Sequence, residues 1–276
     1  CRAELEAVDD PTLLRGMDAE LRATLRDDGL TTIADVANLS PGDGRIDDAD
    51  VVTQARAITA GRLLRLDQGD GPLPLPAPDI EIDLDLETIN GRIYLAGLLI
   101  SGNGTSRFEP VAEWDDSWEA ERILLERLFR RFAEWDGSGV VVYHWTNYES
   151  RTLAEAAARH GLSIPGHDSI ESWFEHNAFD LYEWTRTHLV SPSGYSLKVI
   201  APLCGFEWRD DDPGGLQSEI WYEALQDGDA SMEGRLLAYN EDDVIAQREV
   251  RRWVREADAG SGPGSGIPSV HQWSID

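Results

Sequence analysis

Acidic residues in the segment Glu81–Glu87 have a spacing that suits metal-dependent chemistry. Acidic and aliphatic residues alternate there, so a β-strand would place Asp83, Asp85 and Glu87 on one face. Carboxylates that share a face raise one another's pKa unless a cation lies among them. Because Mg²⁺ and Mn²⁺ prefer oxygen ligands, the row is a candidate site for these ions. The solvated face of an edge strand in a very acidic protein explains the pattern equally well.

A second acidic group lies near the C-terminus, in the segment Tyr239–Val244. In a helix, Tyr239 and Asp243 are four residues apart and share a face, whereas Asp242 points elsewhere. An acidic stretch on the solvated side of a helix is the alternative interpretation, which the acidic composition slightly favours. That alternative leaves the tyrosine one turn from a carboxylate unexplained.

A third candidate, Glu149, follows the apolar, β-branched segment 139–144, which has the length of a buried strand. In open α/β sheets, ligands bind beyond the carboxyl ends of such strands. Taken alone, however, Glu149 is better explained as an acid in the first turn of a helix, where it complements the helix dipole.

The elements that must position these residues alternate between strands and helices. Alternation and apolar runs predict strands at 81–87, 92–101 and 139–144. The spacing of apolar residues and the flanking signals predict helices at 117–135, 148–160, 180–188, 196–203, 216–227 and 233–256. This order predicts an α/β fold with a mixed sheet flanked by helices.

Composition divides the chain into four parts. Residues 1–66 are predicted to be helical, with helices at 12–28 and 49–66 and a further one after a Thr N-cap at 31–32. Residues 67–78 are rich in Pro and Gly and predict a linker. We expect the α/β domain to occupy 79–258 and a flexible tail to occupy 259–276.

The overall composition excludes several classes of protein. The chain has 276 residues, a formal net charge of −28 and 41% hydrophobic residues, enough for a sizeable core. Apolar runs fall short of the ~18 residues of a membrane span, and we expect a cytoplasmic protein with no membrane partner. Cys1 and Cys204 are too few for a disulfide scaffold. The acidity argues against a broad polyanion-binding surface, but a local metal site can still bind nucleic acid.

Taken together, three short motifs resemble those of DEDD-type exonucleases of the tyrosine subtype, which have a ribonuclease H-like fold. The motifs are Asp85-x-Glu87, Glu149 five residues after a histidine, and Tyr239-x-x-x-Asp243. Further segments resemble the C-terminal domain of RecB-like nucleases: Tyr143-His144, Tyr148-Glu149, Phe179-Asp180-Leu181-Tyr182, Tyr195-Ser196-Leu197-Lys198, Cys204-Gly205-Phe206-Glu207-Trp208 and Tyr239-Asn240-Glu241-Asp242-Asp243. The resemblance covers about residues 79–256.

The resemblance implies a 3′–5′ exonuclease that hydrolyses phosphodiester bonds of single-stranded DNA or RNA. Two divalent metal ions, Mg²⁺ or Mn²⁺, would be held by Asp85, Glu87, Glu149 and Asp243. Tyr239 would orient the attacking water or help to deprotonate it.

Glu149 departs from the family's pattern, which has Asp at this position. The extra methylene moves the carboxylate by ~1 Å, a misplacement that costs on the order of 10²-fold in rate. Asp83 and Asp180 are acids able to compensate, although Asp180 is interpreted as structural or peripheral. If activity is lost, the alternative function is a nucleic-acid-positioning module of a larger RecB-like nuclease or helicase assembly. A third hypothesis is a protein-interaction domain whose acids are solvated.

The resemblance also implies a longer protein. A RecB-like nuclease domain and a cysteine group that holds an iron–sulfur cluster would precede this segment, with Cys1 as a remnant of that group, and a helicase is a candidate partner. Residues 11–66 resemble helix-hairpin-helix repeats, although the segment Asp27–Leu30 lacks the usual Gly-x-Gly hairpin. A three-helix spacer explains these residues equally well.

Overall fold

The chain folds into two units in the computed structural model. The larger unit comprises Pro74–Glu183 and Cys204–Arg252, and the smaller comprises Cys1–Leu73, Trp184–Leu203 and Trp253–Asp276. The structure describes residues 2–40, 46, 49–66, 72–210, 215–259 and 267–272.

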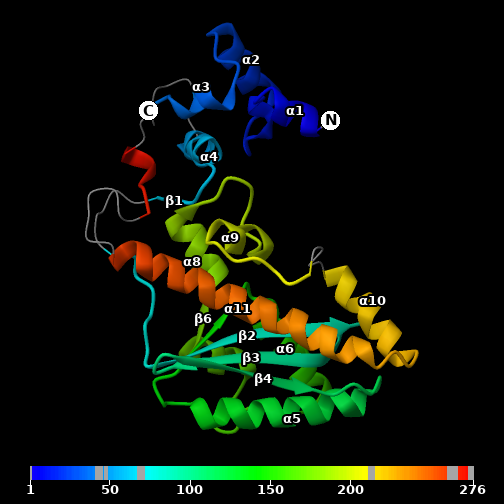
Figure 1. The fold of residues 1–276 in the computed structure, drawn as a ribbon. Helices are drawn as coiled ribbons and strands as arrows, with labels where there is room; N and C mark the ends of the chain where they lie inside the picture. The colour runs from blue at the N-terminus through cyan, green and yellow to red at the C-terminus, as the bar shows by residue number, and fades with distance from the viewer. Residues whose placement is uncertain are drawn as a thin grey trace. The chain divides into compact units, whose positions relative to one another are not determined.

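A five-stranded mixed sheet lies at the centre of the larger unit (Figure 1). Its strands are β2 (Ile80–Ile89), β3 (Arg92–Gly102), β4 (Thr105–Ala112), β5 (Val141–His144) and β6 (Ala178–Asp180), in the spatial order β4-β3-β2-β5-β6. Strand β2 pairs antiparallel with β3 and parallel with β5. The predicted α/β class with a mixed sheet is confirmed, and the acidic strand β2 lies inside the sheet rather than at its edge.

One face of the sheet packs against α5 (Trp118–Trp135), α6 (Tyr148–His160) and α7 (Ile170–Asn177). Three alternating aliphatic residues of β2, Ile82, Leu84 and Leu86, are buried here in one cluster with apolar residues of the three helices. Because side chains alternate along a strand, this packing turns the acids of β2 toward the opposite face.

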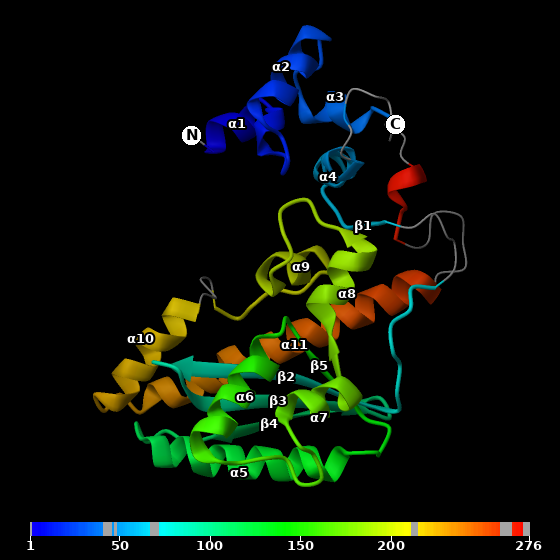
Figure 2. The same cartoon turned by 180° about the vertical axis from the view of Figure 1, so that it is seen from behind.

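Helix α11 (Ser231–Ala259) crosses that opposite face, while α5 covers the first (Figures 1 and 2). Gln247 on α11 donates from Nε2 to the carbonyl oxygen of Leu84, at 3.1 Å. Helix α10 (Gly215–Gln226) packs on the same side and shares an apolar cluster with α11 and β3. The acids of β2 are therefore covered by α11, which places polar side chains such as Gln247 against the strand.

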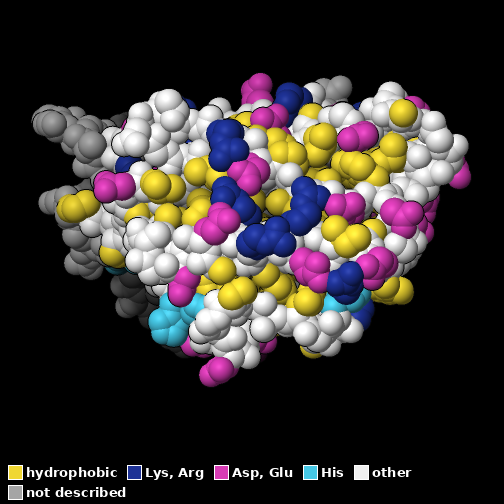
Figure 3. All heavy atoms as spheres, turned by 90° about the horizontal axis from the view of Figure 1, so that it is seen from below, with side chains coloured by type: hydrophobic (Ala, Val, Ile, Leu, Met, Phe, Trp, Pro, Cys, Tyr) yellow, Lys and Arg dark blue, Asp and Glu magenta, His cyan; other side chains and the backbone are white. Residues whose placement is uncertain are grey.

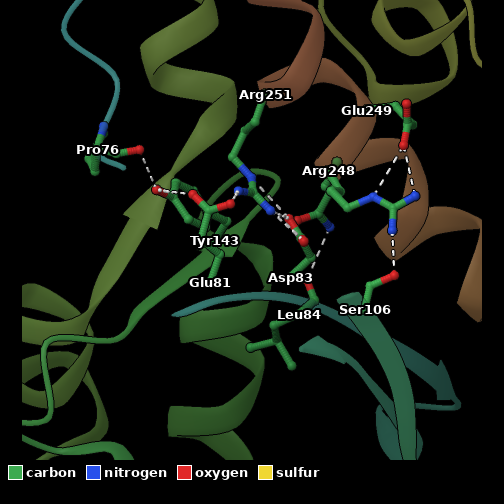
Figure 4. A network of polar contacts seen from close by, with 10 residues as sticks. Pro76, Glu81, Asp83, Leu84, Ser106, Tyr143, Arg248, Glu249 and Arg251 are labelled. Atoms are coloured by element: carbon green, nitrogen blue, oxygen red, sulfur yellow. Dashed lines mark hydrogen bonds and ion pairs between the residues drawn. The ribbon is translucent and has the colours of Figure 1, made fainter. Parts of the chain in front are cut away.

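Arg251 on α11 is fully buried and neutralises the beginning of the acidic row (Figure 4). Its Nη2 lies 2.5 Å from Oδ2 of Asp83, and its Nη1 lies 2.5 Å from Oε2 of Glu81. The guanidinium also lies over the ring of Tyr143, 3.9 Å from the centroid. Burial raises the pKa of Asp83 to about 6, although the charge of Arg251 acts in the opposite direction. This ion pair fastens α11 to the sheet.

The smaller unit begins with a helical segment, as predicted. Its elements are α1 (Arg2–Ala7), a 3₁₀ turn (Pro11–Leu13), α2 (Ala19–Asp27), α3 (Ile33–Ala37), α4 (Ala49–Ala60), β1 (Leu64–Arg65), β7 (Leu189–Val190), α9 (Leu197–Leu203) and a 3₁₀ turn (Val270–Gln272), while α8 (Leu181–His188) begins in the larger unit. Apolar residues of α2, α3 and α4 form a separate core. Thr32 caps α3 as expected, in a capping box with Asp35.

Two helix predictions in this segment are wrong. The expected helix at 12–28 is interrupted because Gly16 has a φ of 83° and Asp18 caps a new start at Ala19. The expected helix at 49–66 ends at Ala60 because Gly61 has a φ of 62°, after which Leu64–Arg65 form β1. The sequence patterns also miss β4, β6 and α7.

The predicted linker and tail lie partly outside the described residues. Of the linker, residues 72–78 are described and have neither helix nor strand. Of the tail, Val270 is fully buried, and its carbonyl oxygen accepts a hydrogen bond from Nη1 of Arg56 at 2.5 Å. Over the part of the chain that the structure describes, none of the helices has the length and apolarity that crossing a bilayer requires.

The buried ion pair leads to a stability prediction. Asp83→Asn removes the charge that Arg251 faces and leaves a buried guanidinium poorly compensated, so it should lower the free energy of unfolding by about 3–5 kcal/mol. Arg248→Gln breaks the partly exposed pair with Glu249 on the same helix and should cost less than about 1 kcal/mol. Urea denaturation compares the two variants. Equal losses would show that the buried pair does not fasten α11.

Candidate metal centre

Three carboxylates meet on the side of the sheet that α11 covers. Asp85 and Glu87 lie on β2 and Asp243 lies on α11, and one oxygen atom of each lies within 4.8 Å of the others. Glu87 and Asp243 are buried, and Asp85 is partly exposed. Full ionisation of three carboxylates at this spacing is unfavourable unless a positive charge compensates them.

Two backbone periodicities produce this cluster. Asp85 and Glu87 share a face because they are two residues apart on a strand, and Asp243 shares a face of α11 with Tyr239 one turn earlier. Asp242 points elsewhere, as expected, and accepts a hydrogen bond from Nε of Arg209 at 2.7 Å. Tyr239 and Asp243 are only 4% and 6% exposed, so the solvated-helix interpretation of this segment is wrong. The internal position of β2 likewise excludes a solvated edge strand.

Neutral donors from three elements hydrogen-bond to the carboxylates. Nδ2 of Asn240, on α11, donates to Oδ2 of Asp85 at 2.7 Å. Nε1 of Trp208, in the loop before α10, donates to Oδ1 of Asp243 at 2.7 Å, and Oγ of Ser218, on α10, donates to Oε2 of Glu87 at 3.0 Å. These bonds fix the orientation of each carboxylate without removing its negative charge.

The place of Asn240 depends on a glycine in the neighbouring strand. Gly97 on β3 is the register partner of Asp85 on β2, and Asn240 fills the space above it. A Cβ atom at Gly97 would lie 1.8 Å from Oδ1 of Asn240, far inside van der Waals contact. Only glycine at this position lets α11 bring Asn240 to Asp85.

Tyr239 lies beside the three carboxylates and is buried. Its ring packs edge-on against Trp221 of α10, with the centroids 5.7 Å apart. Burial raises the pKa of Tyr239 far above its ordinary value, and the negative charges of Asp243, Glu87 and Asp85 act in the same direction. Without a cation in the cluster, the phenol therefore keeps its proton at neutral pH and can donate a hydrogen bond.

Glu149 is not a member of the cluster of three. It is buried in the first turn of α6, with Oε2 at 3.7 Å from Nδ1 of His144. Burial raises the pKa of Glu149, and His144 acts against this increase. Thr146, in the turn between them, has a φ of 77°, which is strained for a β-branched residue. A strained turn beyond β5 therefore carries the chain to Glu149.

The two acids considered as substitutes for Glu149 have other partners. Asp83 is held by Arg251 in the buried ion pair described above. Asp180 accepts a hydrogen bond at Oδ1 from the backbone N–H of Glu183, at 3.0 Å, at the start of α8. This bond agrees with the structural role expected for Asp180.

The donor set of the cluster fits a hard divalent cation. Carboxylate oxygens from Asp85, Glu87 and Asp243 are close enough to bind a common centre, and oxygen ligands suit Mg²⁺ and Mn²⁺. A divalent ion would also relieve the repulsion among the three groups. The three carboxylates are therefore suitable ligands for Mg²⁺ or Mn²⁺.

Comparison with protein families supports the assignment of the fold. The family model RNase_H_2, described as RNase_H superfamily, matches residues 79–255. The matched segment is well over half of the chain and includes the three carboxylates, Glu149 and Tyr239. A search among curated proteins found no match.

Sequence reasoning missed the residues that orient the carboxylates. Asn240 and Trp208 lie within segments that resemble RecB-like nucleases, but no spacing rule connects them to the carboxylates that they contact. Ser218 and Gly97 gave a weaker signal still, although a glycine inside an apolar strand is a known sign of close backbone approach.

The close approach at Gly97 leads to a prediction with a matched control. Gly97→Ala should push Asn240 away from Asp85 and lower the free energy of unfolding by about 1–3 kcal/mol, as overpacking does. Gly234→Ala, in α11, adds a methyl group with nothing within 4 Å and should raise that free energy by about 0.5–1 kcal/mol. Thermal or urea unfolding measures both changes. A neutral Gly97→Ala would contradict the close packing at this site.

Proposed function

The chain belongs to the ribonuclease H superfamily, and on that premise we propose that it is a 3′–5′ exonuclease that hydrolyses phosphodiester bonds of single-stranded DNA or RNA. One observation carries the proposal: three carboxylates from β2 and α11 lie within 4.8 Å of one another inside the matched domain. An acidic cluster in a domain of this superfamily indicates a metal-dependent nuclease. The exonuclease activity and its direction rest on the resemblance of the motifs.

The proposed ligands are Asp85, Glu87 and Asp243, with Glu149 as a fourth. Two divalent ions, Mg²⁺ or Mn²⁺, would activate the attacking water and stabilise the leaving oxygen of the phosphodiester. Because the substrate itself is negatively charged, an all-carboxylate site can accept it only when cations neutralise the carboxylates.

The neighbouring side chains have positioning roles in this proposal. Asn240, Ser218 and Trp208 keep the three carboxylates aimed at a common centre, which lowers the cost of ordering them during binding. Tyr239 keeps its proton and orients the attacking water by donating a hydrogen bond. The alternative role, in which the phenol helps to deprotonate the water, requires bound cations, because the neighbouring carboxylates otherwise raise the pKa of Tyr239.

A second function is favoured by the position of Glu149. Its carboxylate is buried against His144 and is not one of the three that cluster, which would leave the metal site one ligand short. In that case the domain would position a nucleic-acid strand for a RecB-like nuclease domain or a helicase. Glu149→Asp distinguishes the two functions. If the site is inactive only because the Glu149 side chain is too long, this substitution should restore cleavage; a positioning module should stay inactive.

Cleavage of end-labelled single-stranded DNA and RNA tests the proposal. Wild-type protein should degrade the strand from its 3′ end in Mn²⁺ or Mg²⁺ and not in EDTA. Asp243→Asn keeps the shape of the side chain but removes a ligand charge, so it should reduce the rate on the order of 10²-fold or more. Glu249→Gln is the matched control. It removes a carboxylate of α11 that pairs with Arg248, away from the three clustered carboxylates, and should leave the rate unchanged.

The outcomes of this assay are distinct. Metal-dependent laddering that is lost only in Asp243→Asn supports the nuclease, and the labelled end reports its direction. Equal cleavage by wild type and Asp243→Asn would mark the activity as a contaminant. Binding without cleavage would favour the positioning module.

A further inference from the structure

The turn between β5 and α6 leads to a buried carboxylate whose charge is poorly compensated. Glu149 is 3% exposed, and within the described part of the chain its Oε2 has no hydrogen-bond partner. Nδ1 of His144 lies 3.7 Å from this oxygen, which is too far for a hydrogen bond. Asp180, the register partner of His144 on β6, adds a further negative charge nearby. A carboxylate in these surroundings gains more from a cation than a solvated one does.

Acids on the surface of the same unit have different surroundings. Figure 3 shows the side of α5, where arginines and acidic side chains lie among one another. Arg122 pairs with Glu119, and Arg131 pairs with Glu109 and Glu134. The charges of these carboxylates are stabilised by a guanidinium and by water, whereas Glu149 is buried beside a histidine.

His144 donates its hydrogen bond to the backbone of the turn instead of to Glu149. Its Nδ1 lies 2.5 Å from the carbonyl oxygen of Thr146, and because a carbonyl oxygen can only accept, Nδ1 carries the proton of this bond. Thr146 has a φ of 77°, which a β-branched residue keeps only when its neighbours hold it there. The hydroxyl oxygen of Thr146 accepts a hydrogen bond from the backbone N–H of Tyr148 at 3.2 Å. These two bonds hold the strained turn that leads to Glu149.

The register of the sheet places this turn beside the metal centre. Strands β2 and β5 are parallel neighbours, with Asp83 beside Tyr143. Asp85, two residues further along β2, is therefore level with the beginning of the turn. At the other end of the turn, the hydroxyl of Tyr148 shares a hydrogen bond with Oγ1 of Thr88 on β2, at 2.8 Å. The turn is thus tied to the strand that carries two of the three clustered carboxylates.

We infer that His144 is a positioning residue for the metal centre. Its N–H holds the turn in the conformation that presents Glu149 to a divalent ion on the three clustered carboxylates. The inference rests on the proposed function, in which Glu149 is the fourth ligand. His144 acts through the backbone of Thr146 and does not bind the ion.

Mn²⁺ binding, measured by electron paramagnetic resonance of the Mn²⁺ that remains free, tests this role without substrate. His144→Phe and His144→Ala both remove the N–H donor, and the first keeps an aromatic ring beside Phe174, whose centroid lies 5.4 Å from that of His144. Each should weaken Mn²⁺ binding about ten-fold, as loss of a group that orients a ligand does. His144→Asn should rescue the affinity, because its amide N–H is attached to Cγ as Nδ1 is.

Glu149→Gln shows whether His144 acts through this carboxylate. It should weaken Mn²⁺ binding by itself, and adding His144→Phe should then cause no further loss. His176→Phe is the matched control, since Nδ1 of the exposed His176 also donates to a carbonyl oxygen, that of Ser172 in α7, at 2.7 Å. The control should bind Mn²⁺ like wild type, and thermal unfolding in EDTA should show that every variant is folded.

Several results would overturn the inference. These are an affinity of His144→Asn as weak as that of His144→Ala, wild-type affinity in His144→Phe or Glu149→Gln, and a further loss when His144→Phe is added to Glu149→Gln. Absence of Mn²⁺ binding by wild type would overturn the inference together with the metal centre. Cleavage is measured separately, so Mn²⁺ binding that depends on His144 without cleavage contradicts the proposed nuclease and not this role.

Discussion

Negative charge on one face of an internal strand is the constraint on which this structure depends. Strand β2 directs Glu81, Asp83, Asp85 and Glu87 toward α11, where water cannot fully solvate them. At the beginning of the strand, the buried guanidinium of Arg251 compensates the first two. Further along, Asp243 adds another carboxylate to the group instead of a counter-charge. The acidic row therefore has two parts. Arg251 neutralises Glu81 and Asp83, whereas Asp85 and Glu87 are left for a divalent cation.

A single helix provides both kinds of contact. The same face of α11 bears Arg251, which fastens the helix to the sheet, and Asn240 and Asp243, which form part of the metal centre. Asp243 and Arg251 are eight residues apart on this helix, so the ion pair of Arg251 helps to set the position of the Asp243 carboxylate. Fold stability and site geometry are coupled in this domain, because both depend on how α11 lies against β2.

The sequence predicted the periodic features and missed those that depend on packing. Alternation along β2 and the four-residue spacing of Tyr239 and Asp243 placed these residues on the correct faces, because a local repeat determines the direction of each side chain. No local repeat reveals that Gly97 lies opposite Asp85, since the register between β2 and β3 decides it. The same holds for Arg251, whose partner lies 168 residues away. The wrong prediction of a helix at 12–28 has a local cause. Gly16 and Asp18 are sequence signals for a break and a new helix start, but the prediction followed the spacing of the apolar residues instead.

Calorimetric titration with Mn²⁺ is the most direct test of the central claim, that Asp85, Glu87 and Asp243 form a divalent metal site. The titration needs no substrate and no knowledge of the strand. The account predicts that wild type and Glu249→Gln bind Mn²⁺ with the same affinity and that Asp243→Asn binds it far more weakly. Equal binding by all three proteins, or no binding by wild type, would contradict the account.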